Sequence, residues 1–252
     1  MNQNHQAFSI TNGTSGLMVL YIHGLMGSPF EFRKFLDHLP LDRVDASALL
    51  LPGHGGSSAD FAAANTRIWQ DYVLQQVGAL KCQYKRLILI GHSMGGLLAL
   101  NAARKYPIDG IILLNTPFKT HTTLGQMDIA LKVTFAPKSN HDPLLQAYRD
   151  TFSVSLADWW HILAWLPKIL DIQRLLKAST RNLEEIHSPV RLFQSLNDET
   201  VDPLSAELFS EHLNHNLKQK TELNHSTHAY FSAADLTLIK QGILQTIEDS
   251  LK

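Results

Sequence analysis

The chain has 252 residues, of which 44% are hydrophobic and 18% charged, a composition typical of folded globular proteins. Its 22 basic and 23 acidic side chains nearly cancel, so no overall charge points to nucleic acid or an anionic membrane as partner. No apolar run approaches the roughly 18 residues of a membrane span, and the first residues lack a secretory signal pattern. The single cysteine, Cys82, excludes an internal disulfide, which fits a reducing compartment. We therefore expect a cytoplasmic protein.

Strand-like and helix-like segments alternate along most of the chain. Strand patterns fall at residues 17–22, 44–50, 86–91, 110–115, 190–195 and 217–223. Helical patterns fall at residues 29–39, 66–80, 94–105, 203–213 and 233–250. Such alternation predicts an α/β fold with a mainly parallel sheet of about six to seven strands, flanked by helices.

The third predicted strand ends in Gly91-His92-Ser93-Met94-Gly95, which places a serine at a sharp corner between a strand and a helix. Glycines fit two residues to either side of Ser93, because a strained turn leaves no room for side chains there. The serine is a candidate nucleophile, and the N–H of Met94 at the helix N-terminus is a candidate donor to an oxyanion. An ordinary Gly-Ser turn before a helix is the alternative.

A second oxyanion donor is expected from the loop that follows the first predicted strand. Gly24 and Gly27 let that loop turn so that the N–H of Leu25 faces the hydroxyl of Ser93. His23 precedes them and is interpreted as a structural residue that is hydrogen-bonded under the loop.

A serine hydroxyl becomes a good nucleophile only beside a base that a third group orients. The polar loop after predicted strand 190–195 carries three acidic residues, and Asp198 is our choice among them. Asp202 directly precedes Pro203 and is interpreted as the cap of the next helix. Glu199 is interpreted as a solvated loop carboxylate.

Two histidines compete for the role of base in the loop after the last predicted strand, His225 and His228. Ser232 and Asp235 have the spacing of a capping box, which predicts that the final helix begins near residue 233. His228 then lies on the short loop that enters this helix, and we choose it as the base. His225 is interpreted as a polar loop residue.

The interval 118–185 breaks the alternation, since it is too long for a simple crossover and has no clear strand. We expect a helical cap over the sheet edge, inserted into a core domain of residues 1–117 and 186–252. The aromatic and aliphatic side chains of the cap pack it onto the core, and some of them are expected to roof an apolar pocket above the serine. The candidate pocket residues are Met26, Phe30, Phe118, Trp159 and Trp160.

Several motifs resemble those of the α/β-hydrolase superfamily over nearly the whole chain. They are His23-Gly24, Leu51-Pro52-Gly53-His54-Gly55, Gly91-His92-Ser93-Met94-Gly95-Gly96, Asp198 and His228. Within the superfamily, the chain resembles compact bacterial carboxylesterases and monoacylglycerol lipases. This narrower likeness rests on Trp69-Gln70-Asp71, Asn115-Thr116-Pro117, Asp198-Glu199-Thr200-Val201-Asp202-Pro203 and Ser226-Thr227-His228. Two features depart from the family. The loop of the candidate base has a second imidazole, that of His225, and the usual N-terminal hairpin is absent or reduced to a short segment near Phe8-Ser9-Ile10.

The resemblance implies a serine hydrolase with Ser93 as nucleophile, His228 as general base and acid, and Asp198 as the group that orients it. Leu25 and Met94 would supply the oxyanion-hole amides. The expected reaction is cleavage of a small carboxylic ester with an apolar acyl group, through an acyl-enzyme intermediate.

Other activities on the same fold stay open at this point. They are a thioesterase or amidase, a carbon–carbon bond hydrolase or lyase, and a ligand-binding module that has lost useful catalytic activity. No cofactor and no metal are expected, since His212 and His215 lack a carboxylate at useful helical spacing. The oligomeric state is left open.

Overall fold

The computed structural model describes residues 5–13, 15–121, 142–154 and 160–252, with the backbone alone for residues 143, 160–167 and 169. Its strands form one seven-stranded sheet in the order β1-β3-β2-β4-β5-β6-β7. β2 to β7 run parallel, and β1 pairs antiparallel with β3 at the edge. The bounds are β1 (Phe8–Ile10), β2 (Leu17–Ile22), β3 (Asp45–Leu49), β4 (Arg86–His92), β5 (Gly110–Leu114), β6 (Val190–Ser195) and β7 (Leu217–Leu223). The predicted mainly parallel sheet is confirmed.

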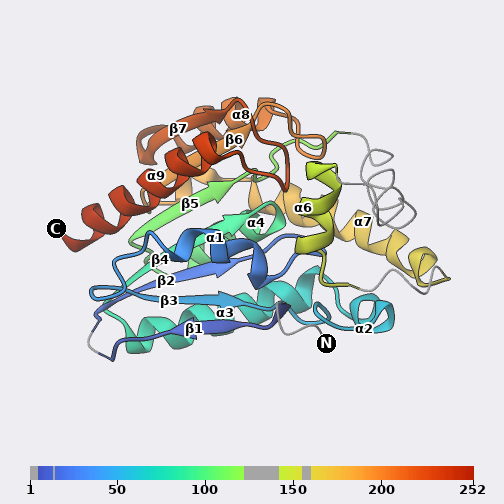
Figure 1. The fold of residues 1–252 in the computed structure, drawn as a ribbon, viewed down its shortest axis with the longest axis horizontal. Coiled ribbons are helices and arrows are strands. Elements are labelled where there is room, and N and C mark those ends of the chain that lie inside the picture. Colours follow the sequence, from blue (N-terminus) through green and yellow to red (C-terminus); the bar gives the residue numbers. More distant parts are fainter. Residues whose placement is uncertain (1–4, 14, 122–141, 155–159) are drawn as a thin grey trace.

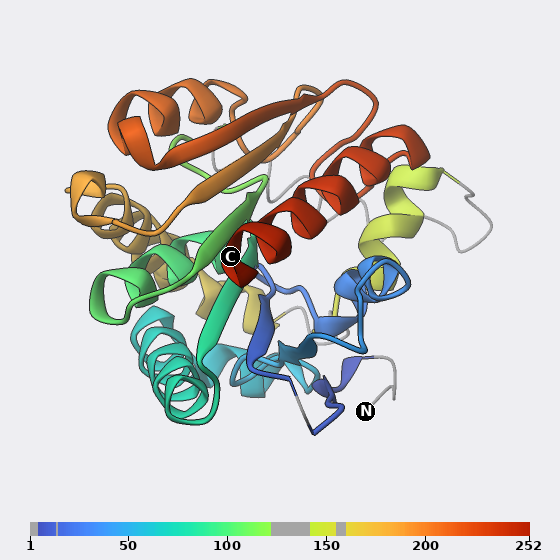
Figure 2. The same ribbon diagram turned by 90° about the vertical axis from the view of Figure 1, so that its left-hand side faces the viewer.

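Helices cover both faces of the sheet. α1 and α9 lie on one face and α3, α4, α7 and α8 on the other (Figures 1 and 2). The helix bounds are η2 (Pro29–Phe32), α1 (Arg33–Leu36), α2 (Ser58–Ala63), α3 (Thr66–Gln83), α4 (Met94–Lys105), α6 (Pro143–Thr151), α7 (Trp160–Ser179), η3 (Leu183–Glu185), α8 (Leu204–Leu213), η4 (Asn214–Asn216) and α9 (Ala233–Leu251).

The central strand β2 is apolar throughout because both of its faces are buried. Its six side chains are at most 1% exposed, because helices cover both faces of a parallel sheet. Leu17, Val19 and Tyr21 belong to the hydrophobic cluster of α1 and α9, whereas Met18, Leu20 and Ile22 belong to that of α3, α4 and α8.

Two helices differ from the prediction. The expected helix at 29–39 is a 3₁₀ turn, η2, followed by the four-residue α1, and the chain then continues through i→i−3 hydrogen bonds. The helix α2 was not predicted, although Ser57 and Asp60 form a capping box at its start. The Ser57 hydroxyl accepts from the Asp60 N–H at 3.2 Å, and the Asp60 carboxylate accepts from the Ser57 N–H at 2.9 Å.

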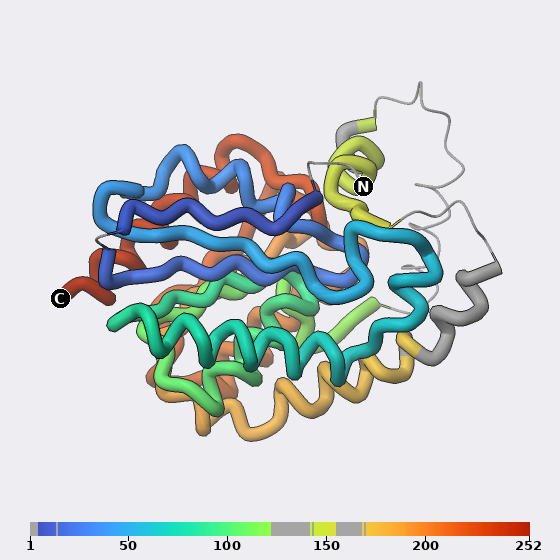
Figure 3. Tube along the Cα trace, turned by 90° about the horizontal axis from the view of Figure 1, so that it is seen from below, coloured from blue at the N-terminus to red at the C-terminus, as the bar shows by residue number. Residues whose placement is uncertain are grey.

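Two described helices, α6 and α7, belong to the interval between β5 and β6. Of these, α6 stands beyond the strand ends and α7 passes along one side of the molecule (Figures 1 and 3). The N–H of Ser153 donates to the carbonyl oxygen of Met26 at 2.9 Å, which fixes the end of α6 to the loop after β2. Lys168 on α7 donates to the carbonyl oxygen of Ala62 at 3.0 Å. The division of the chain into a core and an inserted cap stays a prediction.

Two of the pocket candidates fall where side chains are not described. Trp159 lies outside the described residues, and Trp160 begins α7 with its side chain undescribed. Across the described ranges, no helix is both long and apolar enough to cross a membrane.

Candidate active site

Ser93 lies at a sharp corner between β4 and α4, where its backbone adopts φ 53° and ψ −123°. Residues other than glycine seldom occupy this region, and such strained residues cluster at functional sites. A methyl group at Gly91 would lie 2.5 Å from the Cα of Gly96, and one at Gly95 would lie 2.0 Å from the carbonyl oxygen of Ile22. The corner therefore requires the glycines that flank the serine.

The loop after β2 packs directly on this corner. A methyl group at Gly24 would lie 2.9 Å from the Cβ of Ser93, and the N–H of Gly27 donates to the carbonyl of Gly24 at 3.2 Å. Met94 begins α4, and the first N–H groups of a helix have no partner within it. Leu25, Met94 and Ser93 line one pocket. The structure thus places the two residues predicted to supply the amide donors at the same pocket as the predicted nucleophile.

Two buried histidines support the same loop from below. Nε2 of His23 accepts from the N–H of Leu51 at 3.0 Å, and its Nδ1 donates to the carbonyl of Gly24 at 2.8 Å. Nε2 of His54 accepts from the N–H of Met26 at 3.2 Å. Burial lowers the pKa of His23, and burial together with the nearby His23 lowers the pKa of His54 well below its ordinary range. Both imidazoles are therefore neutral, and the hydrogen bonds of His23 agree with its interpretation as a structural residue under the loop.

Asp198 and His228 meet at the carboxyl edge of the sheet. Nδ1 of His228 lies 2.9 Å and 3.1 Å from the two carboxylate oxygens of Asp198. The N–H groups of Thr200 and Val201 donate to the same carboxylate at 2.8 Å and 2.7 Å. Burial acts to lower the pKa of His228, but the charge and hydrogen bond of Asp198 outweigh it and raise that pKa. With Nδ1 turned to Asp198, Nε2 is the nitrogen that can serve as a base.

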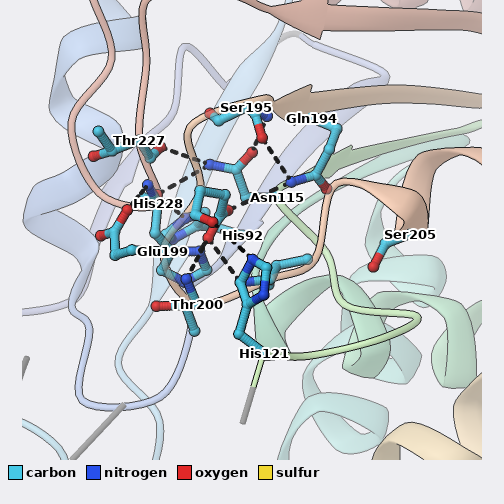
Figure 4. A network of polar contacts seen from close by, with 12 residues as sticks. His92, Asn115, His121, Gln194, Ser195, Glu199, Thr200, Ser205, Thr227 and His228 are labelled. Atoms are coloured by element: carbon cyan, nitrogen blue, oxygen red, sulfur yellow. Dashed lines mark hydrogen bonds and ion pairs between the residues drawn. The ribbon is translucent and has the colours of Figure 1, made fainter. Parts of the chain in front are cut away.

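Side chains from three other segments fix the main chain of His228 (Figure 4). Its carbonyl oxygen accepts from Nε2 of His92 at 2.9 Å and from the amide of Asn115 at 3.1 Å. Its N–H donates to the carboxylate of Glu199 at 3.2 Å. The predicted base is therefore held through its backbone as well as through its ring.

Ser93 and His228 open onto the same cavity, which has a volume of about 110 Å³. Its wall is mainly apolar and comes from the loop after β2, from α4 and from residues on and near α6 and α7. The lining residues are Leu25, Met26, Ser93, Met94, Leu97, Pro117, Thr120, Tyr148, Phe152, Ile172, Thr200, Val201 and His228. A small cavity of this kind suits an apolar group placed next to Ser93.

The fold agrees with a comparison against known families, in which the model of the alpha/beta hydrolase family matches residues 19–238. The chain belongs to the alpha/beta hydrolase family.

Relatives of this alpha/beta hydrolase include the thermostable monoacylglycerol lipase of Bacillus sp. (strain H-257), which is 26% identical over 95% of the chain and 93% of the relative. Among solved structures, one reported for LipS and LipT, two metagenome-derived lipolytic enzymes, has a TM-score of 0.73 at 20% identity and covers 98% of both chains. Monoglyceride lipase from Saccharomyces cerevisiae has a TM-score of 0.68 at 16% identity, over 97% of this chain and 91% of that one. These two structural likenesses support the fold.

The residues that competed with Asp198 and His228 have other roles in this alpha/beta hydrolase. His225 is exposed, and its N–H donates to the buried carboxylate of Asp235 at 2.9 Å. Asp202 accepts from the N–H of Leu204 at 3.0 Å at the start of α8, and Lys119 lies 2.9 Å from its carboxylate. This hydrogen bond agrees with the interpretation of Asp202 as a cap, but α8 begins at Leu204 and Pro203 occupies the N-cap position, one residue later than predicted.

Glu199 corrects the sequence analysis. We expected a solvated loop carboxylate, but it accepts from the hydroxyl of Tyr148 on α6 as well as from the N–H of His228. Burial, followed by the neighbouring charge of Glu199, raises the pKa of Tyr148. The sequence alone held no signal for this contact, because the two residues lie 51 positions apart and α6 was not placed.

Of the predicted pocket residues, Met26 lines the cavity but Phe30 and Phe118 do not. Pro117 occupies the pocket wall, and the next side chain, Phe118, turns to α8, where its ring packs edge-on against Phe209 at 5.1 Å between centroids. Phe30 lines a second cavity of about 260 Å³ on the other flank of α6. For these two residues the expectation was wrong, since loop position does not fix the direction of a side chain.

The described residues contain no group of three or more histidine, cysteine or acidic side chains arranged to hold a metal ion. Nδ1 of His212 lies 2.7 Å from the carbonyl oxygen of Leu208, one turn earlier in α8. The ring of His212 also packs against that of Phe118, with centroids 5.1 Å apart. His212 therefore belongs to the end of α8.

Proposed function

We propose that this alpha/beta hydrolase cleaves carboxylic esters with an apolar acyl group, using Ser93, His228 and Asp198. The observation that carries the proposal is a strained serine that shares a cavity with an imidazole, whose Nδ1 is held 2.9 Å from a buried carboxylate. Asp198 is only 4% exposed, so its charge acts on His228 with little screening by water.

The reaction begins when Oγ of Ser93 attacks the carbonyl carbon of the ester and its proton passes to Nε2 of His228. The carbonyl oxygen becomes an oxyanion, to which the N–H groups of Leu25 and Met94 donate. The intermediate collapses as His228 returns the proton to the leaving alcohol, and the acyl group stays on Ser93. Water, deprotonated by His228, then attacks the acyl-enzyme and releases the carboxylic acid and the free serine.

The wall of the cavity supports an apolar acyl group. Met26, Leu97 and Ile172 come from three different segments and present aliphatic side chains to it. Such a wall favours alkyl groups over sugars or charged metabolites, because it offers few partners for polar substituents. The similarity to a monoacylglycerol lipase over nearly the whole chain is consistent with this substrate class.

Labelling with a fluorophosphonate tests the nucleophile. The expected adduct maps to Ser93 by peptide mass spectrometry and is absent from Ser93→Ala, whose kcat with p-nitrophenyl butyrate falls about 10⁶-fold. Ser210→Ala is the matched control, because the hydroxyl of Ser210 donates within α8, to the carbonyl oxygen of Ala206 at 2.7 Å. An adduct elsewhere, or full activity of Ser93→Ala, would overturn the proposal.

A substrate panel tests the reaction class. We expect p-nitrophenyl esters to be cleaved with a higher kcat/KM than the matched anilides and to show an optimum in acyl chain length. A dedicated carbon–carbon lyase would turn over the esters poorly and without such an optimum, and that result would replace the ester assignment.

A further inference from the structure

Glu31 is a buried carboxylate that the reaction described above does not use. It lies on η2 and is only 7% exposed. Its Oε2 lies 3.2 Å from Nδ1 of His92, whose side chain is 8% exposed. Its Oε1 has no hydrogen-bond partner among the described residues. A carboxylate in such surroundings is costly unless a partner compensates it, so the contact with His92 requires an explanation.

The second nitrogen of His92 determines where protons must lie. Nε2 is 2.9 Å from the carbonyl oxygen of His228, and a carbonyl oxygen can only accept. Nε2 therefore carries a hydrogen. In a neutral imidazole Nδ1 would then be an acceptor, and it could not bond a carboxylate that also accepts. The contact between Nδ1 and Glu31 consequently requires one additional proton, which makes the pair neutral as a whole.

The pKa of Glu31 indicates which partner holds that proton. Burial alone acts to raise the pKa of this carboxyl, but the pairing with His92 and the nearby charge of Lys34 lower it. An imidazole is ordinarily the stronger base of the two groups, and the direction of the pKa of Glu31 agrees with an ionised carboxylate, so we assign the additional proton to Nδ1 of His92. This assignment puts a positive charge on the residue next to Ser93 in the chain and its counter-charge on η2.

We propose that Glu31 is a positioning residue, which keeps His92 doubly protonated so that His92 fixes the main chain of His228 relative to Ser93. This inference rests on the proposed function, since it assigns the pair to the base of that reaction. His92 is the neighbour of Ser93 in the chain, so its hydrogen bond to the carbonyl of His228 joins the segment of the nucleophile to the loop of the base.

The counter-charge on Glu31 matters because the rings of His92 and His228 lie close together, with centroids 5.0 Å apart. His228 becomes a cation when it takes the proton of Ser93. An unpaired cation at His92 would oppose that step, whereas an ion pair of zero net charge opposes it much less. The pair therefore gives a strong donor to the backbone of His228 without a repulsive charge beside its ring.

The charge state can be tested in the folded wild-type protein by nitrogen-15 NMR of histidine side chains at neutral pH. We expect two protonated nitrogens for His92, assigned by their disappearance in His92→Asn. Replacing Glu31 by glutamine should leave one protonated nitrogen, Nε2, because the glutamine amide can donate to an unprotonated Nδ1. An unprotonated Nδ1 in the wild-type protein would overturn the proposal, and this readout does not depend on activity.

The positioning role is tested by kinetics on the same variants. We expect Glu31→Leu to lower kcat on the order of 100-fold, because a small displacement of the base slows the reaction by about this factor. The KM should change little, since Glu31 does not line the pocket. Glu31→Gln should recover only part of that loss of kcat, because its amide still holds the ring of His92 by Nδ1 while Nε2 of the uncharged ring is a weaker donor. An unchanged kcat in folded Glu31→Leu would contradict the role.

Asp45→Asn provides the matched control for these variants. Asp45 is another buried carboxylate, which accepts from the hydroxyl of Tyr84 at 2.7 Å, far from the site on β3. The kcat and the His92 signals of Asp45→Asn should equal those of the wild-type protein. If Asp45→Asn loses as much kcat as Glu31→Leu, the positioning role of Glu31 is contradicted. Full activity of Ser93→Ala would instead contradict the proposed function, without changing the protonation of His92 that NMR measures.

Discussion

The side-chain amide of Asn115 donates to the carbonyl oxygen of His228 at 3.1 Å, across 113 positions of the chain. The same amide donates to the carbonyl of Thr227 at 3.0 Å, and its oxygen accepts from the N–H of Ser195 at 2.8 Å. Asn115 has a φ of 44°, in the left-handed region that asparagine tolerates better than most residues. One side chain directly after β5 thus joins the end of β6 to the loop of the proposed base (Figure 4).

We expect Asn115→Asp to lower kcat on the order of 100-fold. The carboxylate cannot donate to the carbonyl oxygens of Thr227 and His228 and repels them, which displaces His228. The free energy of unfolding should fall by about 1–3 kcal/mol, the cost of leaving buried polar groups unpaired. Ester turnover and urea denaturation measure the two effects. Asn197→Asp serves as the control, because Asn197 makes one similar bond, to the carbonyl of Asn224 at 2.9 Å, but is exposed. Equal losses in the two variants would contradict a specific role for Asn115.

The carboxylate of Asp198 is expected to be needed for turnover rather than for folding alone. Asp198→Asn should lower kcat about 10⁴-fold, because the amide favours the wrong tautomer of His228 and cannot stabilise its cation. Asp202→Asn should keep kcat near the wild-type value, since Asp202 caps α8 through Leu204. Steady-state kinetics on p-nitrophenyl butyrate distinguish the two. A kcat of Asp198→Asn within tenfold of that of the wild-type protein would remove Asp198 from the mechanism.

The sequence allowed a choice of candidate residues where local pattern is informative. Ser93 was chosen from the glycines around it, and Asp198 and His228 from their loops at strand ends, and the structure brings Asp198 and His228 together. All three choices depend on neighbours within a few positions in the chain, where strand, turn and helix signals are strong.

Contacts between distant segments could not be predicted in this way. Glu31 and His92 are 61 positions apart, and Tyr148 and Glu199 are 51 apart. Each of these residues is of a type that usually faces solvent or fills a core, so only the folded chain shows its partner. The role of Phe118 was misjudged for the same reason, since its direction depends on the packing of α8.

The second glycine after Met94 is expected to be required for folding stability. A methyl group at Gly96 would lie 1.9 Å from the hydroxyl oxygen of Thr116, so Gly96→Ala should lower the free energy of unfolding by about 1–3 kcal/mol despite the higher helix propensity of alanine. Gly16→Ala is the control, because no described residue other than its chain neighbours lies within 4 Å of the added methyl group. Chemical denaturation of both variants gives the comparison. A neutral or stabilising Gly96→Ala would show that α4 can move away from β5.

The pH dependence of turnover should reflect the charges around His228. Its pKa is raised by Asp198 first, and also by Glu199 and Glu31, against the lowering effect of burial. A base must be unprotonated, so kcat/KM should fall as the pH drops through a value above the ordinary 6.5 of histidine. Glu199→Gln removes one of the raising charges, and its acid limb should therefore move to lower pH.

The control for this shift is Glu207→Gln, which removes an equal charge that pairs with Lys220 on the surface. Its acid limb should coincide with that of the wild-type protein, because exposed charges are screened by water and salt. Profiles of kcat/KM against pH for the three proteins, at fixed ionic strength, separate a local effect at His228 from a change in net charge. An acid limb of Glu199→Gln that stays in place or moves upward would mean that Glu199 does not act on the charge of His228.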